Sequence, residues 1–531
     1  MLPQKHYLVM QRARALQPLV RKKPDGAARL ALTILYLWQR ESFPALVRRA
    51  PRPDKRLILE PKITSFANWL SESNLLDGAF WLSSAYALWV GDGVRTERAM
   101  FFTPPELSTR LIDNLVRNKA SLTHHVWMDP ASGGAAFLAP VAMRMASELH
   151  DRGMRPKAIL KHIASHLIGN DIDPTLASMS TQFLRMALCK EITEAGFEPR
   201  FEVLKVDALS RLKRYRSKID VVICNPPYRK MVAAEVSQHS GGYNDVIVGQ
   251  PNLYGLFFKL ALQLLRQDGV AGLVTPTSFM SGLYFSPLRT YLLKNADTVQ
   301  LDIVTKRDGS FAEAALETVI SILKKQKPKA TSTRKTRVFA FDKENGFTNI
   351  GHCVLPNSGL AWPVPRDKGD AATIRAVNGT PFRLKDYGYR VRIGAFVWNR
   401  DQRQTFRSIR GASKSRALIP LIWSSDIRQS GRLEFGRLHH EDDSAKFVDM
   451  GQKNHSSIVC RPCVALQRVT SPEQPRRLVG APVSREFLQR YGGVVGENHV
   501  VFLEQVDSKP LLSPSQLAAV LRSEPIDRIF R

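Results

Sequence analysis

The central part of the chain, residues 96–330, alternates short apolar runs with longer amphipathic stretches. This alternation predicts strands and helices in turn, and favours an α/β domain with a mostly parallel sheet. Because no long helix separates the last two predicted strands, we expect them to form an antiparallel hairpin at one edge. The predicted strands are 126–128, 166–170, 201–206, 220–224, 270–275, 299–304 and 318–323, and the predicted helices are 105–117, 137–151, 175–195 and 253–265.

Further regions flank this central domain. Residues 1–95 are basic and rich in helix formers, which predicts a helical N-terminal region. Residues 328–337 combine basic residues with Ser, Thr and Pro, and are predicted to be a linker. Residues 338–531 show little helical periodicity and several short β-like runs, which predicts a mixed α+β domain. The central domain is therefore expected to span 96–327.

The net charge restricts the partners of the chain. Its 77 Lys and Arg against 48 Asp and Glu give +29, and residues 381–531 contain 25 basic and 15 acidic residues. Nucleic acid binds such a protein strongly and in a salt-dependent way, because counterions are released. Five Cys form no disulfide framework, no apolar run could span a bilayer, and no signal peptide is indicated. We expect a cytoplasmic protein without a membrane partner.

The most informative motif is Asn225-Pro226-Pro227-Tyr228, directly after the predicted strand 220–224. Open α/β sheets bind ligands beside the carboxyl ends of their strands. Two consecutive prolines fix the backbone and leave carbonyls without a local amide partner. The motif therefore offers two rigid acceptors, the Asn225 side-chain oxygen and the Pro226 carbonyl, beside the Tyr228 ring. Such a site fits a planar amine; the alternative is a strand-ending turn covered by a tyrosine.

Acidic residues end three successive predicted strands ahead of this motif. Asp129 ends the first strand and is followed by the small-residue turn 131–136, where a nucleotide-like ligand can lie against backbone amides. Asp171 follows the second strand, at the place where ribose hydroxyls are usually held, and Asp207 follows the third. This ordered series predicts a nucleotide-like cofactor next to an amine-binding site.

Together these segments resemble the amino-methyltransferases of adenine in DNA, of the gamma arrangement typified by the TaqI methyltransferase. The resemblance covers residues 100–325, and the motifs occur in the family's order. It implies an α/β, Rossmann-like class I S-adenosylmethionine-dependent methyltransferase domain and a C-terminal target-recognition domain. It also implies that the substrate is double-stranded DNA. The protein would be the modification half of a bacterial restriction–modification system, associated with the nucleoid and paired with a separate cognate restriction endonuclease.

The resemblance also assigns roles to individual residues. It implies that Asp171 binds the ribose hydroxyls of the cofactor, that Asp207 contacts the adenine amine of the cofactor, and that Phe257 packs on that adenine. The implied cofactor-binding residues are Thr103, Asp129, Ala131, Gly133, Asp171, Ile172, Asp207, Ala208 and Phe257. The implied catalytic residues are Asn225, Pro226, Pro227, Tyr228 and Phe285, and no metal ligand is implied. One position departs from the family pattern, because Ala135 replaces the last glycine of the first turn and adds a Cβ where positive φ can be required.

The implied mechanism is direct methyl transfer to an adenine that has left the base stack. Asn225 and the Pro226 carbonyl would accept both amino hydrogens and draw the nitrogen lone pair towards the methyl group. Tyr228 and Phe285 would hold the flipped ring by stacking, at about 1–3 kcal/mol each. Because alignment of an activated methyl and an amine supplies most of the catalysis, no nucleophile of the enzyme is needed.

Other classes of function share parts of this pattern. Methyltransferases of a protein glutamine amide also carry Asn-Pro-Pro-Tyr, and a DNA-binding protein with an inactive methyltransferase domain would keep the same segments. Methylation of a cytosine ring carbon needs a nucleophilic Cys, usually after a Pro, in the catalytic domain. The pair Pro462-Cys463 lies outside that domain, so chance explains it better.

Two sets of residues have weak metal-site patterns, and one region offers candidate base contacts. Cys460 and Cys463 with His439, His440 and His455 could form half a zinc site, but a second Cys pair is missing. Asp54 with Glu60-Pro61-Lys62 faintly matches a nuclease metal site, although a solvated charged loop explains it better. Arg beside amides and aromatics is typical of base readers or of a solvated basic face. It occurs at 392–400, 467–470 and 476–477.

Overall fold

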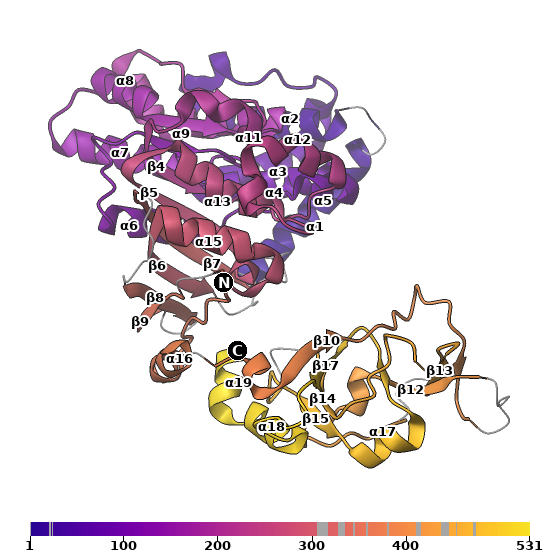
Figure 1. Cartoon of the computed structure of the whole chain (residues 1–531). Coiled ribbons are helices and arrows are strands. Elements are labelled where there is room, and N and C mark those ends of the chain that lie inside the picture. The colour runs from indigo at the N-terminus through magenta and orange to yellow at the C-terminus, as the bar shows by residue number, and fades with distance from the viewer. Residues whose placement is uncertain are drawn as a thin grey trace. The chain divides into compact units, whose positions relative to one another are not determined.

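A computed structural model describes residues 2–20, 23, 25–304, 317–327, 335–342, 346–356, 359–379, 382–409, 416–436, 445–452, 454–470 and 474–530. The chain divides into two compact units, residues 1–367 and 368–531. In Figure 1 the first unit runs from indigo through magenta, and the second runs from orange to yellow. Among the described helices, none is both long enough and apolar enough to cross a membrane.

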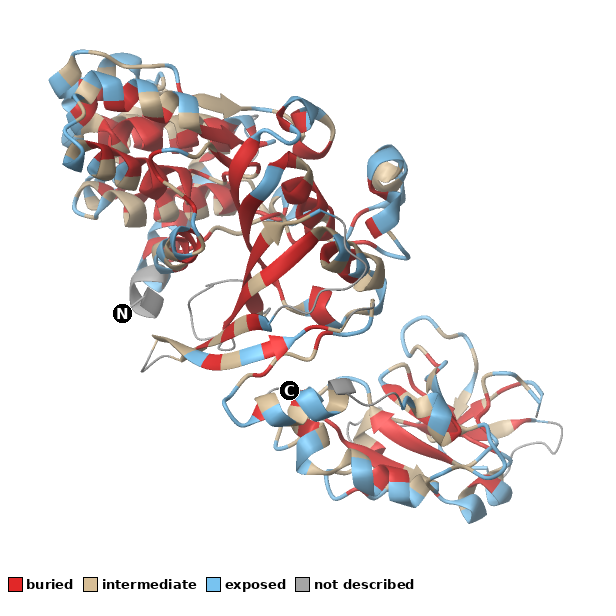
Figure 2. Cartoon of the chain, turned by 60° about the vertical axis from the view of Figure 1, so that its left-hand side comes forward, coloured by how far each residue is buried: buried red, intermediate tan, exposed pale blue. Residues whose placement is uncertain are grey.

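A nine-stranded sheet forms the centre of the first unit, in the order β3-β2-β1-β4-β5-β7-β6-β8-β9. The first five strands in this order, β3, β2, β1, β4 and β5, are parallel to one another. Strand β7 lies between β5 and β6 and runs antiparallel to both. All seven predicted strands are present. They are β1 (Trp127–Asp129), β2 (Leu167–Asn170), β3 (Glu202–Leu204), β4 (Ile219–Cys224), β5 (Leu265–Pro276), β6 (Ala296–Val304) and β7 (Thr318–Lys325). Figure 2 shows the buried residues concentrated along these strands.

Helices accompany the sheet as the amphipathic pattern predicts. In α6 (Pro105–Arg117) a proline starts the helix and Leu107, Leu111 and Leu115 form its buried stripe. The predicted helix 175–195 is interrupted at Leu188, which leaves the helical conformation between α9 and α10. The other helices of this part are α7 (Leu138–Asp151), α8 (Pro156–His166), α9 (Pro174–Ala187), α10 (Cys189–Ala195), α11 (Ala208–Arg211), α12 (Ala233–Tyr243), α13 (Leu253–Leu264), α14 (Ser278–Ser281) and α15 (Ser286–Asn295).

The sheet extends beyond the predicted domain end. The sequence predicts a linker over 328–337 and a new domain from 338, whereas β8 (Lys335–Asp342) and β9 (Gly346–Val354) belong to the first sheet. Residues 328–334 lie outside the described residues. The side chains of Thr336, Val338 and Ala340 are buried on one face, and β8 pairs in parallel with β6. The predicted hairpin of β6 and β7 is therefore antiparallel, but it does not lie at the sheet edge.

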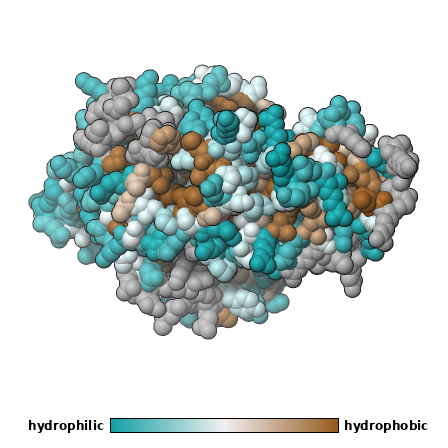
Figure 3. Space-filling view, turned by 60° about the horizontal axis from the view of Figure 1, so that its bottom comes forward, coloured by the Kyte–Doolittle hydropathy of each residue, from teal (hydrophilic) through white to brown (hydrophobic). Residues whose placement is uncertain are grey.

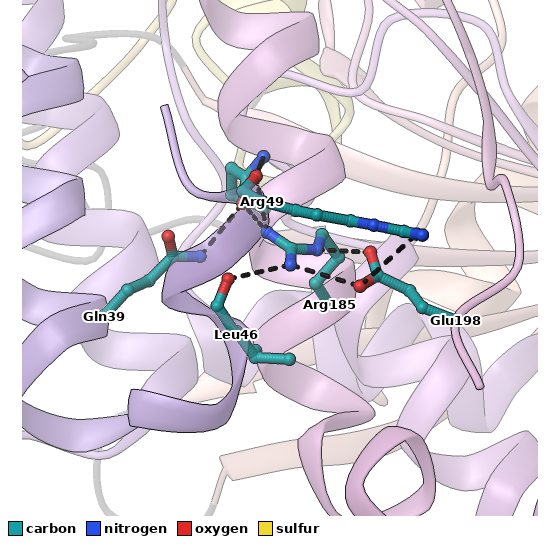
Figure 4. A network of polar contacts seen from close by, with 6 residues as sticks. Gln39, Leu46, Arg49, Arg185 and Glu198 are labelled. Atoms are coloured by element: carbon teal, nitrogen blue, oxygen red, sulfur yellow. Dashed lines mark hydrogen bonds and ion pairs between the residues drawn. The ribbon is translucent and has the colours of Figure 1, made fainter. Parts of the chain in front are cut away.

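The N-terminal region is helical, as predicted, but it is part of the first unit. A buried arginine of α9, Arg185, joins this region to the sheet (Figure 4). Its guanidinium donates to the carbonyls of Leu46 and Arg49, at 2.9 Å each, and pairs with Glu198. Residue 95 is thus no domain boundary. The helices are α1 (Leu2–Val20), α2 (Gly26–Ser42), α3 (Pro61–Ser71), α4 (Leu75–Trp89) and α5 (Asp92–Arg98).

The second unit is mixed α+β, in agreement with the sequence. Its two four-stranded sheets have the orders β10-β17-β14-β15 and β11-β13-β12-β16. Phe502 of β17 and Ile422 of β12 belong to one buried cluster that joins the sheets. The strands are β10 (Tyr389–Ile393), β11 (Thr405–Phe406), β12 (Leu418–Ile422), β13 (Phe447–Asp449), β14 (Cys463–Gln467), β15 (Gly480–Val483), β16 (Val495–Gly496) and β17 (Val500–Gln505). The helices are α16 (Asp370–Gly379), α17 (Arg485–Tyr491), α18 (Pro514–Leu521) and α19 (Glu524–Phe530).

Candidate active site

A cavity of about 460 Å³ lies at the carboxyl ends of β1 to β4. Its wall brings together nine of the predicted site residues: Ala131, Gly133, Asp171, Ile172, Asp207, Ala208, Asn225, Pro227 and Phe257. Four others, Thr103, Asp129, Pro226 and Tyr228, are buried directly beside these wall residues. The remaining one, Phe285, is half-buried and packs on Tyr254. Residues far apart in the sequence therefore meet at one edge of the sheet, as the strand-end pattern predicts.

The turn after β1 has an unusual backbone. Gly133, Gly134 and Ala135 follow one another with φ of 49°, 84° and 60°. A Cβ on Gly134 would lie 2.1 Å from Oγ of Ser83, so glycine alone fits there. Ala135 does occupy the left-handed region in which the family pattern has glycine, and this conformation costs an L-residue about 1–2 kcal/mol.

Asp129 lies beneath this turn, wholly buried. Its Oδ1 accepts a hydrogen bond from the Ala131 amide at 3.0 Å, while its Oδ2 has no hydrogen-bond partner among the described residues. Burial raises the pKa of Asp129 well above its usual range. A buried polar atom without a partner is costly, and a ligand that brings a donor removes that cost.

The Asp171 carboxylate connects two turns at the cavity wall. Oδ2 accepts from the Gly133 amide at 2.8 Å and Oδ1 from the Asp173 amide at 2.9 Å. A carboxylate has about four lone-pair sites, so both oxygens can accept one more donor each. Burial is the main cause that raises the pKa of Asp171 to about 6, against the lowering effect of the two amides. Paired acceptors of this kind suit a ribose diol.

Asn225 has its amide orientation fixed by neighbours. Its Nδ2 donates to the carbonyl of Phe101 at 3.3 Å and to Oγ1 of Thr103 at 2.9 Å. A carbonyl accepts only, so the NH2 group must face Phe101 and Oδ1 must face the other way. The hydroxyl of Tyr228 lies between that Oδ1 and the carbonyl of Val274. Asn225 lines the cavity, and its oxygen is thus fixed as an acceptor on the side of Tyr228.

The aromatic residues form a connected group behind Asn225. The Tyr228 ring meets Tyr254 edge-on with centroids 6.0 Å apart, and Tyr254 stacks on Phe285 at 5.2 Å. The structure thus brings Tyr228 and Phe285 to the two sides of Tyr254. Burial raises the pKa of Tyr228 well above its usual range, so its hydroxyl keeps its proton at neutral pH.

Sequence reasoning missed several wall residues. The Asn170 amide donates to the carbonyls of Pro130 and Val206 at 3.0 Å each, and so ties the ends of three strands. Its polar side chain at a strand end was the available signal. Residues 97–102 and His239 also line the cavity, and Arg98 pairs with Asp173. Nothing in the local sequence indicates these contacts, because they join distant segments.

Most of the candidate base readers in the second unit hold the unit itself together. Gln467 donates to the carbonyls of Ser424 and Ile427, Arg392 pairs with Glu504, and Arg476 donates to the Arg522 carbonyl. By contrast, the side chains of 398–400 and Arg468 are exposed. They are accessible to a partner, although Arg468 also donates to the Asn498 carbonyl at 3.1 Å and Trp398 packs edge-on against Trp423.

The two weak metal-site patterns have ordinary surroundings. In the described residues no three His, Cys, Asp or Glu side chains are grouped to hold a metal ion. Cys460 is exposed while Cys463 is buried, and His439 and His440 lie outside the described residues. Asp54 accepts from the amides of Arg56 and Leu57, as a loop residue does.

Sequence comparison identifies the family. The chain is 30% identical over 454 residues to the type II methyltransferase M.BsuBI of Bacillus subtilis, covering 82% of this chain and 84% of that protein. The chain belongs to the type II methyltransferases. The present chain is also 24% identical over 330 residues to the type II methyltransferase M.PstI of Providencia stuartii. That alignment spans 60% of this chain and 62% of M.PstI. Membership of this family decides against a protein glutamine-amide methyltransferase.

Further comparisons agree on domain and fold. A family model described as Eco57I restriction-modification methylase matches residues 159–309. The structure resembles the type IIL restriction-modification enzyme MmeI, solved in complex with DNA, with a TM-score of 0.54 at 12% identity. That match covers 93% of this chain and 76% of MmeI. The methyltransferase therefore has the Rossmann-like class I fold that the sequence predicts, and S-adenosylmethionine is its methyl donor.

The cavity of the methyltransferase fits this cofactor on chemical grounds. The carboxylate of Asp171 offers two acceptors to a diol, and the buried Oδ2 of Asp129, which has no partner among the described residues, can accept a hydrogen bond from an N–H donor such as an ammonium group. Apolar side chains of Ile172, Ala208 and Phe257 line the same wall and suit an adenine ring. We assign these residues to the cofactor as a proposal that the next experiment tests.

Cofactor affinity is expected to depend on pH through Asp171. Because its pKa is raised to about 6, the carboxyl is ionised at pH 7 and becomes protonated, losing acceptor capacity, as pH falls. Calorimetry should show affinity for S-adenosylmethionine falling roughly 10-fold between pH 7 and pH 5. Asp171→Asn should bind about 10–100-fold more weakly at pH 7 and should lack most of this dependence. An unchanged affinity in the variant would place the ribose elsewhere.

Proposed function

We propose that this methyltransferase transfers the methyl group of S-adenosylmethionine to the N6 amine of an adenine that is flipped out of duplex DNA. The observation that carries the proposal is the fixed orientation of Asn225, a cavity-wall residue whose Oδ1 is oriented as an acceptor because its NH2 group contacts Phe101 and Thr103. An exocyclic amine has two hydrogens to donate, and the neighbouring Pro226 carbonyl offers the second acceptor. Two acceptors at the amine favour a nitrogen lone pair directed out of the ring.

The remaining residues of the site position these groups. Bound S-adenosylmethionine supplies an electrophilic methyl group. Thr103 holds the NH2 group of the Asn225 amide, so the oxygen keeps its orientation when the amine arrives. Phe285 and Tyr228 are proposed to hold the base by stacking. Since Tyr254 now packs against both rings, we infer that stacking on Tyr228 requires a shift of this aromatic group.

Recognition of DNA is proposed to come from the second unit. Its excess of basic residues supplies attraction to phosphates, and the exposed segment 398–400 with Arg468 offers Trp, Asn and Arg side chains to base edges. Duplex DNA as the substrate agrees with the solved complex of MmeI with DNA. We also propose that the protein acts on bacterial DNA in the cytoplasm and that a separate cognate endonuclease is paired with it.

The test is the product. DNA from bacteria that express the protein should contain N6-methyladenine at one short sequence, measured by mass spectrometry of nucleosides and by long-read sequencing. Arg468→Ala should relax or weaken that sequence preference while the modified base stays the same, because base contacts specify and do not perform the chemistry. Methylated cytosine in place of methylated adenine would contradict the proposed substrate. Absence of any methylated base with the purified enzyme would support the inactive alternative.

A further inference from the structure

An exposed apolar tip stands beside the aromatic group of the site. It comprises residues 282–285, between α14 and α15, and is called the 282–285 tip. Leu283 is 81% exposed and Tyr284 is 49% exposed. On the face shown in Figure 3, hydrophilic side chains cover most of the surface and hydrophobic ones gather in a few places. A single exposed leucine is ordinary, so the significance of Leu283 depends on what surrounds it.

A buried arginine holds the tip from within. Arg289 of α15 is 2% exposed, and its Nη1 donates to the carbonyls of Phe279 and Gly282 at 2.7 and 2.8 Å. The same guanidinium donates to the carbonyls of Gly359 and Leu360, at 2.8 Å for the shortest contact to each. Burial lowers the pKa of Arg289 from its usual value. One side chain thus fixes both the start of the tip and a second segment beneath it.

The second segment, residues 359–362, also holds the backbone that leads into the tip. The Trp362 amide donates to the Met280 carbonyl at 2.7 Å, and the indole packs edge-on against Phe279 with centroids 5.8 Å apart. Both aromatic side chains are buried. The backbone that carries Leu283 is therefore held by hydrogen bonds and packing on its inner side, while its outer side is exposed.

The tip is continuous with the proposed base-binding residues. Phe285 ends it and stacks on Tyr254, and a Cβ on Gly249 would lie 2.4 Å from the Tyr284 ring. Leu283 is two residues from Phe285, on the same short turn. An apolar side chain on a backbone that is held in place next to the proposed base-binding residues loses less entropy when it binds than one on a free loop.

From this arrangement we propose that Leu283 inserts into the DNA base stack at the place the target adenine vacates. The proposal rests on the proposed function, since it needs a flipped base. Proteins that open or kink DNA insert apolar wedges, Leu among them, between base steps. Insertion would remove the Leu283 side chain from water and fill the gap, which stabilises the extrahelical adenine against return. Leu283 is thus a positioning residue for the transfer step.

The test compares paired and unpaired targets. Single-turnover methylation by the full-length enzyme is measured on a duplex with a normal target pair and on one whose target adenine faces an abasic site. Leu283→Ala should be roughly 10–100-fold slower than wild type on the paired duplex and within about 3-fold of it on the abasic one. Leu283→Met, which keeps an apolar wedge, should restore the rate on the paired duplex. The control Leu59→Ala, at an 80% exposed leucine of the N-terminal region, should change neither rate.

A second readout follows flipping itself. With 2-aminopurine at the target position, wild type should raise the fluorescence of the duplex, and Leu283→Ala should raise it less. Equal rates of Leu283→Ala and wild type on the paired duplex would overturn the proposal, and so would an equal deficit on both duplexes. In either case a wild type that methylates adenine leaves the proposed function intact. A wild type that methylates no adenine in any duplex overturns both.

Discussion

Asn225→Ala is expected to lower methyl transfer by about 10²–10³-fold, comparable to removal of one preorganised group from an enzyme site. The variant removes the Oδ1 acceptor that the contacts to Phe101 and Thr103 hold at the cavity. Since this acceptor acts chiefly when the amine reacts, turnover should fall while DNA affinity stays within about 3-fold. Radiolabelled methyl transfer and an equilibrium binding assay measure the two quantities separately.

Two further variants sharpen this result. Asn225→Asp keeps an acceptor at the cavity but turns a second oxygen towards the Phe101 carbonyl, so its activity should lie between those of wild type and Asn225→Ala. Asn244→Ala, at an exposed asparagine outside the cavity wall, is the matched control and should leave turnover unchanged. If Asn225→Ala retained activity within a few-fold of wild type, the acceptor role proposed for Asn225 would be wrong.

Arg185→Met is expected to lower the free energy of unfolding of the first unit by about 3–5 kcal/mol, as removal of one partner of a buried ion pair does. The Arg185 side chain is 3% exposed, and its loss leaves the carbonyls of Leu46 and Arg49 without this donor and the Glu198 carboxylate paired, among the described residues, only with Arg49, at 3.6 Å (Figure 4). Met retains most of the buried volume, so the effect reports lost charge pairing and hydrogen bonds. The shift of the first thermal or urea transition measures it.

The controls separate burial from charge. Arg214→Ala removes an arginine that is 59% exposed and paired with Glu202, and should cost less than about 1 kcal/mol. Adding Glu198→Gln to Arg185→Met should recover part of the loss, because the Glu198 charge, left with the longer Arg49 contact as its ion pair, is then gone. A loss for Arg185→Met no larger than that for Arg214→Ala would show that the buried Arg185 contributes no more to stability than an exposed ion pair.

Much of the first unit follows from the sequence. The strands from β1 to β7 and the helix α6 are found where the apolar periodicity predicts them, because all of these elements except the half-buried edge strand β3 bury apolar side chains that are visible as a pattern in the sequence. The prediction fails at β8, where a short alternating strand follows a basic segment with linker composition. Such a strand is stabilised mainly by pairing with the hydrogen-bonding edge of β6, and this is not a local property.

The candidate site, too, is predicted in part by the sequence and in part visible only in the structure. The strand-end positions of Asp171, Asp207 and Asn225 predict that they share one edge of the sheet, and the structure brings them to one cavity. The sequence did not reveal Arg98 or His239 on the same wall. Arg98 is 75 positions from its partner Asp173, and His239 is 32 positions from Asp207, so the chain topology brings them there.

The sequence by itself determined the fold class, the order of the motifs and the chemical character of the site. These depend on the local periodicity of apolar residues and on which residues end each strand, and both are properties of the local sequence. The tertiary structure decided where the units end, how Asn225 is oriented, and which arginines are buried in internal contacts and which are exposed. Hydrogen bonds and ion pairs between distant segments, such as those of Arg185, Arg289 and Arg392, fix these properties. Such contacts form only after the chain has folded, so local sequence carries no record of them.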